Sequence, residues 1–130
     1  MASQILIVDD DPDIRETLTE LLEEEGYSCA GAANGQEALQ YLHERPSPAL
    51  ILLDLMMPVM DGFDFRTAQL EAEGLRGIPV IVVSASGRSK QAARDLAASD
   101  YLEKPIDVPL LFKKVRSVCA RPTAWPTESD

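Results

Sequence analysis

The feature that most constrains this chain is a series of short apolar runs separated by segments of helix length. The runs at residues 4–8, 49–53 and 79–83 are almost free of polar residues. Continuous runs of this kind are typical of strands that are buried on both faces. Weaker runs at residues 27–32 and 101–103 predict two more strands. Parallel strands need crossover connections, so the alternation predicts an α/β fold with a parallel sheet covered on both sides.

The segments between the runs predict five helices, at residues 13–25, 36–44, 63–73, from about 89, and 108–120. In the first helix, apolar residues recur at helical spacing, and Gly26 follows where a helix often ends in a left-handed residue. Asp11 or Asp13 could cap its start. One face of the last helix carries Leu111, Val115 and Val118.

Length and composition indicate one domain. The chain has 130 residues, of which 45% are hydrophobic, so we expect a domain at 1–120 and a loose tail at 121–130. The sequence shows neither a long apolar run nor a secretory leader, which favours a cytoplasmic protein. Cys29 and Cys119 lack metal-ligand spacing and are expected to be reduced thiols. A net charge of −10 opposes direct binding to nucleic acid or to an anionic membrane.

Polar residues stand where the predicted strands end. Asp9 and Asp10 follow the first strand, Asp54 the third, Ser84 the fourth and Lys104 the fifth. In open parallel sheets, ligands bind beyond the carboxyl ends of the strands, so these side chains are expected to converge. Taken alone, the run that begins at Asp9 could equally be a cluster that caps a helix. Asp61 fits a turn with Gly62 better than it fits the site.

The chemistry of this set points to phosphoryl transfer. Three neighbouring carboxylates repel each other and need a cation or protonation to coexist. Mg²⁺ prefers oxygen ligands and retains waters, so it suits such a cluster. A carboxylate such as Asp54 can act as a nucleophile, and Lys104 with Mg²⁺ could neutralise the transferred group. Ser84 could donate a hydrogen bond to a phosphoryl oxygen.

Four motifs in order make the chain resemble a response-regulator receiver domain over about residues 4–120. They are Ile5-Leu6-Ile7-Val8-Asp9-Asp10-Asp11-Pro12, Leu53-Asp54-Leu55-Met56-Met57-Pro58 with Asp61-Gly62, Val83-Ser84-Ala85, and Asp100-Tyr101-Leu102-Glu103-Lys104-Pro105. The resemblance implies a flavodoxin-like, doubly wound, five-stranded parallel sheet of order 2-1-3-4-5 with five helices.

The same resemblance implies roles for single residues. Asp54 would accept the phosphoryl group, which Lys104 would bind. Mg²⁺ or Mn²⁺ would be held by Asp54, directly by Asp10, by Asp9 through water, and by the backbone carbonyl of Met56.

The resemblance also implies a switch near the site. Ser84 would be the switch hydroxyl, and Tyr101 would change rotamer when Ser84 moves inward. From the residues alone, Tyr101 is a half-buried strand aromatic. The bond between Lys104 and Pro105 is often cis in this family.

The partners implied are a histidine kinase or a histidine phosphotransfer protein, and a downstream protein bound through the fourth helix, fifth strand and fifth helix. Homodimerisation on phosphorylation is a further expectation. The domain would catalyse its own phosphorylation and dephosphorylation rather than act as an ordinary enzyme. It would be either free-standing or part of a larger regulator or hybrid kinase.

Two departures from the family pattern carry expectations. The segment from Ser84 to Lys104 is slightly short, and residues 97–99 read Ala-Ala-Ser where Gly-Ala-Asp is frequent, so a short or mobile fourth helix is expected. Met56 and Ser86 provide no acid or amide to orient water, which predicts slow loss of the phosphoryl group.

Other functions fit less well. A phosphatase of the haloacid dehalogenase type needs a second acid two residues after the nucleophile, where this chain has Met56. A receiver-like interaction module that works without phosphorylation typically lacks an acid or the lysine, and here all are present. A flavodoxin-type cofactor site would need a Ser, Thr or Gly-rich loop after the first strand, which is missing.

Overall fold

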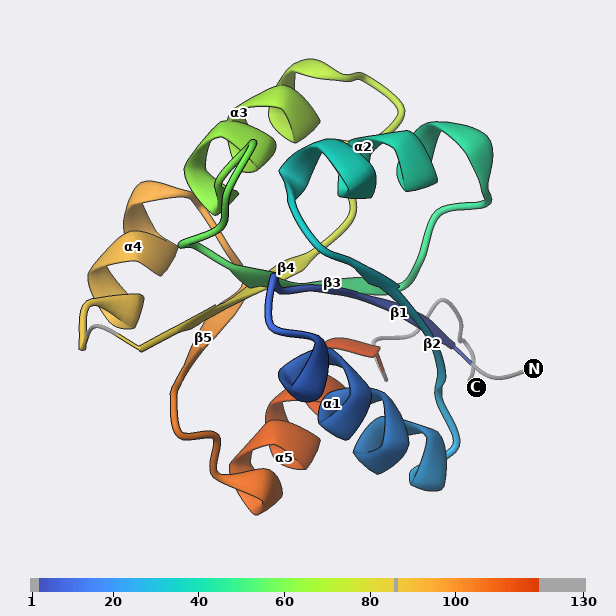
Figure 1. Ribbon diagram of the computed structural model, residues 1–130, viewed down its shortest axis with the longest axis vertical. Helices are drawn as coiled ribbons and strands as arrows, with labels where there is room; N and C mark the ends of the chain where they lie inside the picture. Colours follow the sequence, from blue (N-terminus) through green and yellow to red (C-terminus); the bar gives the residue numbers. More distant parts are fainter. Residues whose placement is uncertain (1–2, 86, 120–130) are drawn as a thin grey trace, which may run out of the picture.

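A five-stranded parallel sheet lies between two layers of helices in the computed structural model, which describes residues 3–85 and 87–119 (Figure 1). The order across the sheet is β2-β1-β3-β4-β5, and every neighbouring pair is parallel. This confirms the predicted flavodoxin-like, doubly wound topology. The strands are β1 Gln4–Val8, β2 Ser28–Ala32, β3 Leu50–Asp54, β4 Val80–Ser84 and β5 Asp100–Glu103.

The helices cover both faces of the sheet. Figure 1 shows α1 and α5 on one side, and α2, α3 and α4 on the other. Their bounds are α1 Pro12–Glu24, α2 Gly35–Glu44, α3 Gly62–Glu71, α4 Ser89–Asp95 and α5 Val108–Cys119. Each predicted element is present, with ends that differ by one or two residues. The expectations for Ser86, Ala120 and the tail at 121–130 lie outside the described residues.

The core has two parts because successive strand residues point to opposite faces of the sheet. Ile5 and Ile7 pack in the cluster with α1 and α5, whereas Leu6 and Val8 pack in the cluster with α2, α3 and α4. Both faces of β1 are therefore buried, which is why its apolar run is continuous rather than alternating.

Helix ends are set by side chains that the sequence identifies. Asp11 caps α1 by accepting a hydrogen bond of 2.9 Å from the Asp13 N–H, and Gly26 beyond the end of α1 has a positive φ of 97°. Asp61 caps α3 by accepting one of 2.8 Å from the Asp64 N–H. Asp11 and Asp61 are therefore capping residues. The helix α4 has only seven residues, so the predicted shortness is confirmed.

The buried face of α3 is unusual because it is half polar. Its buried residues are Gly62, Phe65, Arg66 and Gln69, at the spacing that normally marks an apolar stripe. Arg66 is only 5% exposed and Gln69 is fully buried. Sequence reasoning missed this pair because arginine and glutamine are ordinarily surface residues.

The remaining composition-based expectations concern thiols and membranes. Cys29 and Cys119 are free and half-buried, and burial raises the pKa of Cys29 to about 11. Among the helices at residues 3–85 and 87–119, none combines the length and apolar character required to span a bilayer.

Candidate functional site

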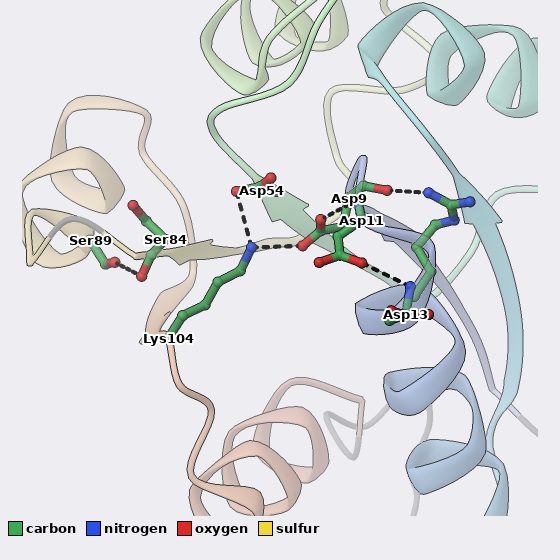
Figure 2. A network of polar contacts seen from close by, with 8 residues as sticks. Asp9, Asp11, Asp13, Asp54, Ser84, Ser89 and Lys104 are labelled. Atoms are coloured by element: carbon green, nitrogen blue, oxygen red, sulfur yellow. Dashed lines mark hydrogen bonds and ion pairs between the residues drawn. The ribbon is translucent and has the colours of Figure 1, made fainter.

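The carboxyl ends of four strands bring the predicted site residues to one edge of the sheet. Asp54 and Ser84 are the last residues of β3 and β4, while Asp9 and Lys104 directly follow β1 and β5. Figure 2 shows Lys104 reaching between Asp9 and Asp54. Asp9, Asp54 and Ser84 are buried, whereas Asp10 is exposed.

Three carboxylates form a cluster that could hold a metal ion. One ligand oxygen from each of Asp9, Asp10 and Asp54 lies within 4.8 Å of the others. An all-oxygen, acidic donor set of this kind fits a hard divalent cation such as Mg²⁺. The residues present therefore fit the ion that the sequence predicted.

The charge on Asp54 is poorly compensated. Burial, together with the neighbouring charge of Asp9, raises its pKa to about 6. Lys104 and a hydrogen bond from the Met56 backbone lower it only in part. A nearby cation or a proton is thus favourable at this position.

Lys104 is the cation that the fold places at the cluster. Its Nζ lies 2.9 Å from Asp9 Oδ2 and 3.6 Å from Asp54 Oδ1. Burial by itself would lower the pKa of Lys104, but the hydrogen bond from Lys104 to Asp9 and the charge of Asp54 raise it overall. Lys104 is therefore held charged between the two buried acids.

Asp9 is fixed through each of its polar atoms. Its N–H donates to the Ala32 carbonyl at 3.1 Å, and its carbonyl accepts from Arg15 Nη1 at 2.6 Å. Its carboxylate accepts from the Asp11 N–H at 2.9 Å and from Lys104. Sequence reasoning missed Arg15. Its signal was its position about one turn into α1, directly after the acidic run, from which its side chain reaches back to the Asp9 carbonyl.

The start of α3 packs directly on the backbone that carries Asp54. The Gly62 N–H donates to the Leu55 carbonyl at 3.0 Å. A Cβ at Gly62 would lie 2.8 Å from Leu55 Cα and would also overlap the Asp54 carbonyl. Only glycine permits this approach. Met56, on the same loop, is 73% exposed.

The two expected switch residues lie on β4 and β5. The Ser84 carbonyl, at the end of β4, accepts from the Lys104 N–H at 2.9 Å and from the Ser89 hydroxyl at 3.3 Å. Tyr101 lies in the middle of β5 and is half-buried, with Lys114 Nζ 4.2 Å from its ring centroid. The bond between Lys104 and Pro105 is cis.

Comparison with known proteins identifies the family. The family model of the response regulator receiver domain matches residues 5–116. The chain belongs to this family. It is a receiver domain of the two-component signalling type.

Solved receiver domains share the fold. The signal receiver domain of a signal transduction histidine kinase from Syntrophus aciditrophicus is 32% identical, with a TM-score of 0.85, and the match covers 98% of each chain. A response regulator receiver protein from Pseudomonas putida is 31% identical, with a TM-score of 0.82 over 90% of this chain and 98% of that one.

Curated relatives include short and long proteins. An uncharacterized 14.6 kDa protein from Leptolyngbya boryana is 41% identical over 117 residues, which is 88% of each chain. The DNA-binding dual master transcriptional regulator RpaA from Synechocystis sp. is 37% identical over 125 residues, which is 95% of this chain and 52% of RpaA. The receiver domain thus spans about half the length of such a regulator.

Proposed function

We propose that this receiver domain accepts a phosphoryl group on Asp54 from a phosphohistidine of a histidine kinase or a phosphotransfer protein. The observation that carries the proposal is a buried carboxylate with a lysine 3.6 Å away and two more acids whose ligand oxygens lie within 4.8 Å. Such a carboxylate has a ready nucleophilic oxygen and neighbours that can neutralise the incoming charge.

The reaction is a displacement at phosphorus. An Asp54 oxygen forms the new bond to phosphorus while the bond from phosphorus to the donor histidine nitrogen breaks, and that nitrogen keeps the electron pair. Mg²⁺ or Mn²⁺ would be held by Asp9, Asp10, Asp54 and the Met56 carbonyl, and it supplies neutralising charge for the phosphoryl oxygens. Lys104, whose Nζ lies 3.6 Å from Asp54 Oδ1, would neutralise part of the remaining charge.

The product creates a switch. Ser84 and Lys104 would bind the phosphoryl oxygens, and the inward movement of Ser84 would let Tyr101 change rotamer. The face formed by α4, β5 and α5 then differs between the two states. A downstream protein, or a second copy of the chain, that binds one state better shifts the equilibrium toward it.

A groove beside the site suits the phosphodonor. It has a volume of about 350 Å³ and is lined by Asp13, Ile14, Thr17, Leu18, Leu21, Lys104, Pro105, Ile106 and Val108. Its lining is largely apolar, and Lys104 belongs to both the groove and the acid cluster. An amphipathic helix seated in the groove would therefore present a histidine toward Asp54.

Thr17→Arg should slow transfer from a kinase but leave phosphorylation by acetyl phosphate unchanged.

The decisive experiment measures phosphorylation by mass. Incubation with Mg²⁺ and acetyl phosphate should add one phosphoryl group to the wild-type chain and none to Asp54→Asn. In Asp10→Asn, Mg²⁺ should no longer stimulate phosphorylation, because a proposed metal ligand is lost. Asp11→Ser keeps a helix cap and should be phosphorylated as wild type. Unmodified wild-type protein would favour an interaction module that works without phosphorylation.

The lifetime of the phosphoryl group is a further part of the proposal. Met56 is exposed and apolar, so it cannot orient a water molecule toward phosphorus. Slow autodephosphorylation is expected, and a lifetime as short as that of the fastest receivers would refute it.

Free thiols at Cys29 and Cys119 support a reducing, cytoplasmic location for this chemistry.

A further inference from the structure

The C-terminal end of α4 adopts a strained turn. The N–H of Ala97 donates to the Arg94 carbonyl at 3.1 Å, and the N–H of Ala98 donates to the Ala93 carbonyl at 2.8 Å. This is the Schellman pattern, which places its central residue in the left-handed region. Ala97 has a φ of 54°, a conformation that glycine adopts readily and alanine does not.

Arg66 of α3 holds this turn through two hydrogen bonds. Its Nε donates to the Leu96 carbonyl and its Nη2 to the Ala97 carbonyl, both at 2.9 Å. Burial lowers the pKa of Arg66. Within residues 3–85 and 87–119, no carboxylate lies at salt-bridge distance from Arg66. The carbonyls at the end of α4 are thus its main electrostatic partners.

Gln69 fixes the guanidinium from the other side. Its Oε1 accepts from Arg66 Nη1 at 2.7 Å. Its Nε2 donates to the carbonyls of Leu75 and Ile78, at 2.9 and 3.0 Å, in the connection between α3 and β4. Arg66 is therefore braced by a buried network and cannot follow a moving α4 without breaking it.

The N-terminal end of α4 is held less firmly. Its capping residue, Arg88, makes no side-chain cap hydrogen bond. The Ser89 hydroxyl lies 3.3 Å from the Ser84 carbonyl and 3.4 Å from Glu103 Oε2, which are long contacts. Figure 2 shows Ser89 directly beside Ser84. The weakly held end of α4 therefore adjoins the proposed switch residue.

We propose that Arg66 is a positioning residue that anchors the C-terminal end of α4 to α3, so that α4 responds to phosphorylation at its N-terminal end alone. The second half of this statement rests on the proposed function. Arg66 confines the movement because Leu96 and Ala97 are held by charge-assisted hydrogen bonds of 2.9 Å, whereas the hydrogen bond from the Ser89 hydroxyl to the Ser84 carbonyl is long, at 3.3 Å.

Amide hydrogen exchange tests the anchor without any phosphodonor. In Arg66→Met, the N–H groups of Leu96, Ala97 and Ala98 should exchange about tenfold faster than in the wild type, because their turn loses its support. Arg66→Lys, which can bond only one carbonyl well, should fall between. The exposed Arg76→Met is the matched control and should exchange as wild type. Unchanged exchange at Ala97 and Ala98 in Arg66→Met would overturn the anchor.

A second variant keeps the test open if Arg66→Met folds poorly. Ala97→Gly relieves the left-handed turn, so the double variant Arg66→Met with Ala97→Gly should regain much of the lost protection at Ala98. If glycine restores nothing, Arg66 does not act through this turn.

The switching half is tested with Mg²⁺ and beryllofluoride. In the wild type, exchange should change at the Ala92 N–H, which donates to the Arg88 carbonyl at the start of α4, and stay constant at Ala98. In Arg66→Met, both should change. An equal change at Ala98 in the wild type refutes the confinement of the response to the N-terminal end of α4. No change anywhere around Asp54 refutes the proposed function instead, and the exchange rates measured without ligand then still decide whether Arg66 anchors α4.

Discussion

Two regions of this receiver domain bury charge, and they do so in opposite ways. At the acid site, the carboxylates of Asp9 and Asp54 lie close together, and the pKa of Asp54 is raised to about 6. On the buried face of α3, Arg66 and Gln69 share a network in which each guanidinium nitrogen of Arg66 donates to a carbonyl or amide oxygen. Poorly compensated charge can respond to an ion or a phosphoryl group. A buried charge that is hydrogen-bonded at each guanidinium nitrogen, as in Arg66, fixes structure instead.

The largest effect is expected where the acid site meets the backbone. In Gly62→Ala, the new Cβ would collide with the backbone of Asp54 and Leu55. Because the backbone must shift, the free energy of unfolding should fall by about 3 kcal/mol, and Mg²⁺ affinity should weaken. Urea denaturation and calorimetric titration measure these changes. Gly77→Ala, which has open space around it, should be nearly neutral.

The next effect breaks the hydrogen-bond network around Arg66. Gln69→Leu removes the side-chain donor to the Ile78 carbonyl and one of two donors to the Leu75 carbonyl, which keeps the Ile78 N–H, and it leaves Arg66 Nη1 without its Gln69 acceptor. The free energy of unfolding should fall by about 2 kcal/mol. Gln91→Leu, on an exposed face of α4, is the matched control. Equal stability of Gln69→Leu and the wild type would show that the network does not stabilise the fold.

A smaller effect of opposite sign is expected at the acid site. The folded pKa of Asp54 lies above its ordinary value of 3.8, so folding disfavours its charged form. In metal-free buffer, Asp54→Asn should raise the free energy of unfolding at pH 7 by about 1 kcal/mol. The gain should grow as pH rises from about 4 to about 6 and vanish below about 4. Denaturation across this range checks the sign, with the exposed Asp13→Asn as control.

The smallest effect concerns strain beside the acid site. The Met60 N–H donates to the Pro58 carbonyl at 2.7 Å, which closes a three-residue turn on Val59. Val59 has a φ of 68° and is 76% exposed. Val59→Gly should stabilise by about 0.5 to 1 kcal/mol, because relief of the β-branched residue exceeds the added freedom of the unfolded chain. Val59→Ala should gain less, and a loss in both variants would argue against strain.

The difference between the regions also explains what the sequence could reveal. Continuous apolar runs identify β1, β3 and β4, and their topology places Asp9, Asp54 and Ser84 at one edge. Each of these inferences uses a local pattern and one rule about parallel sheets. The site was predictable because its residues come directly at strand ends.

The buried network was not predictable in the same way. Arg66 and Gln69 occupy positions on the stripe set by Gly62 and Phe65, but their polarity hides the stripe. The signal was there in the spacing. The sequence could not show what Arg66 binds. Its acceptors are the backbone carbonyls of Leu96 and Ala97, and because every residue type has a backbone carbonyl, no sequence pattern marks them.

The polar face of α3 limits how this domain can be recombined with others. A chimaera that replaces α3 alone with an apolar-faced helix would remove the side-chain donors to the carbonyls of Leu75, Ile78, Leu96 and Ala97. The smallest transplantable module therefore runs from Gly62 through Ala98, because donors and acceptors must travel together.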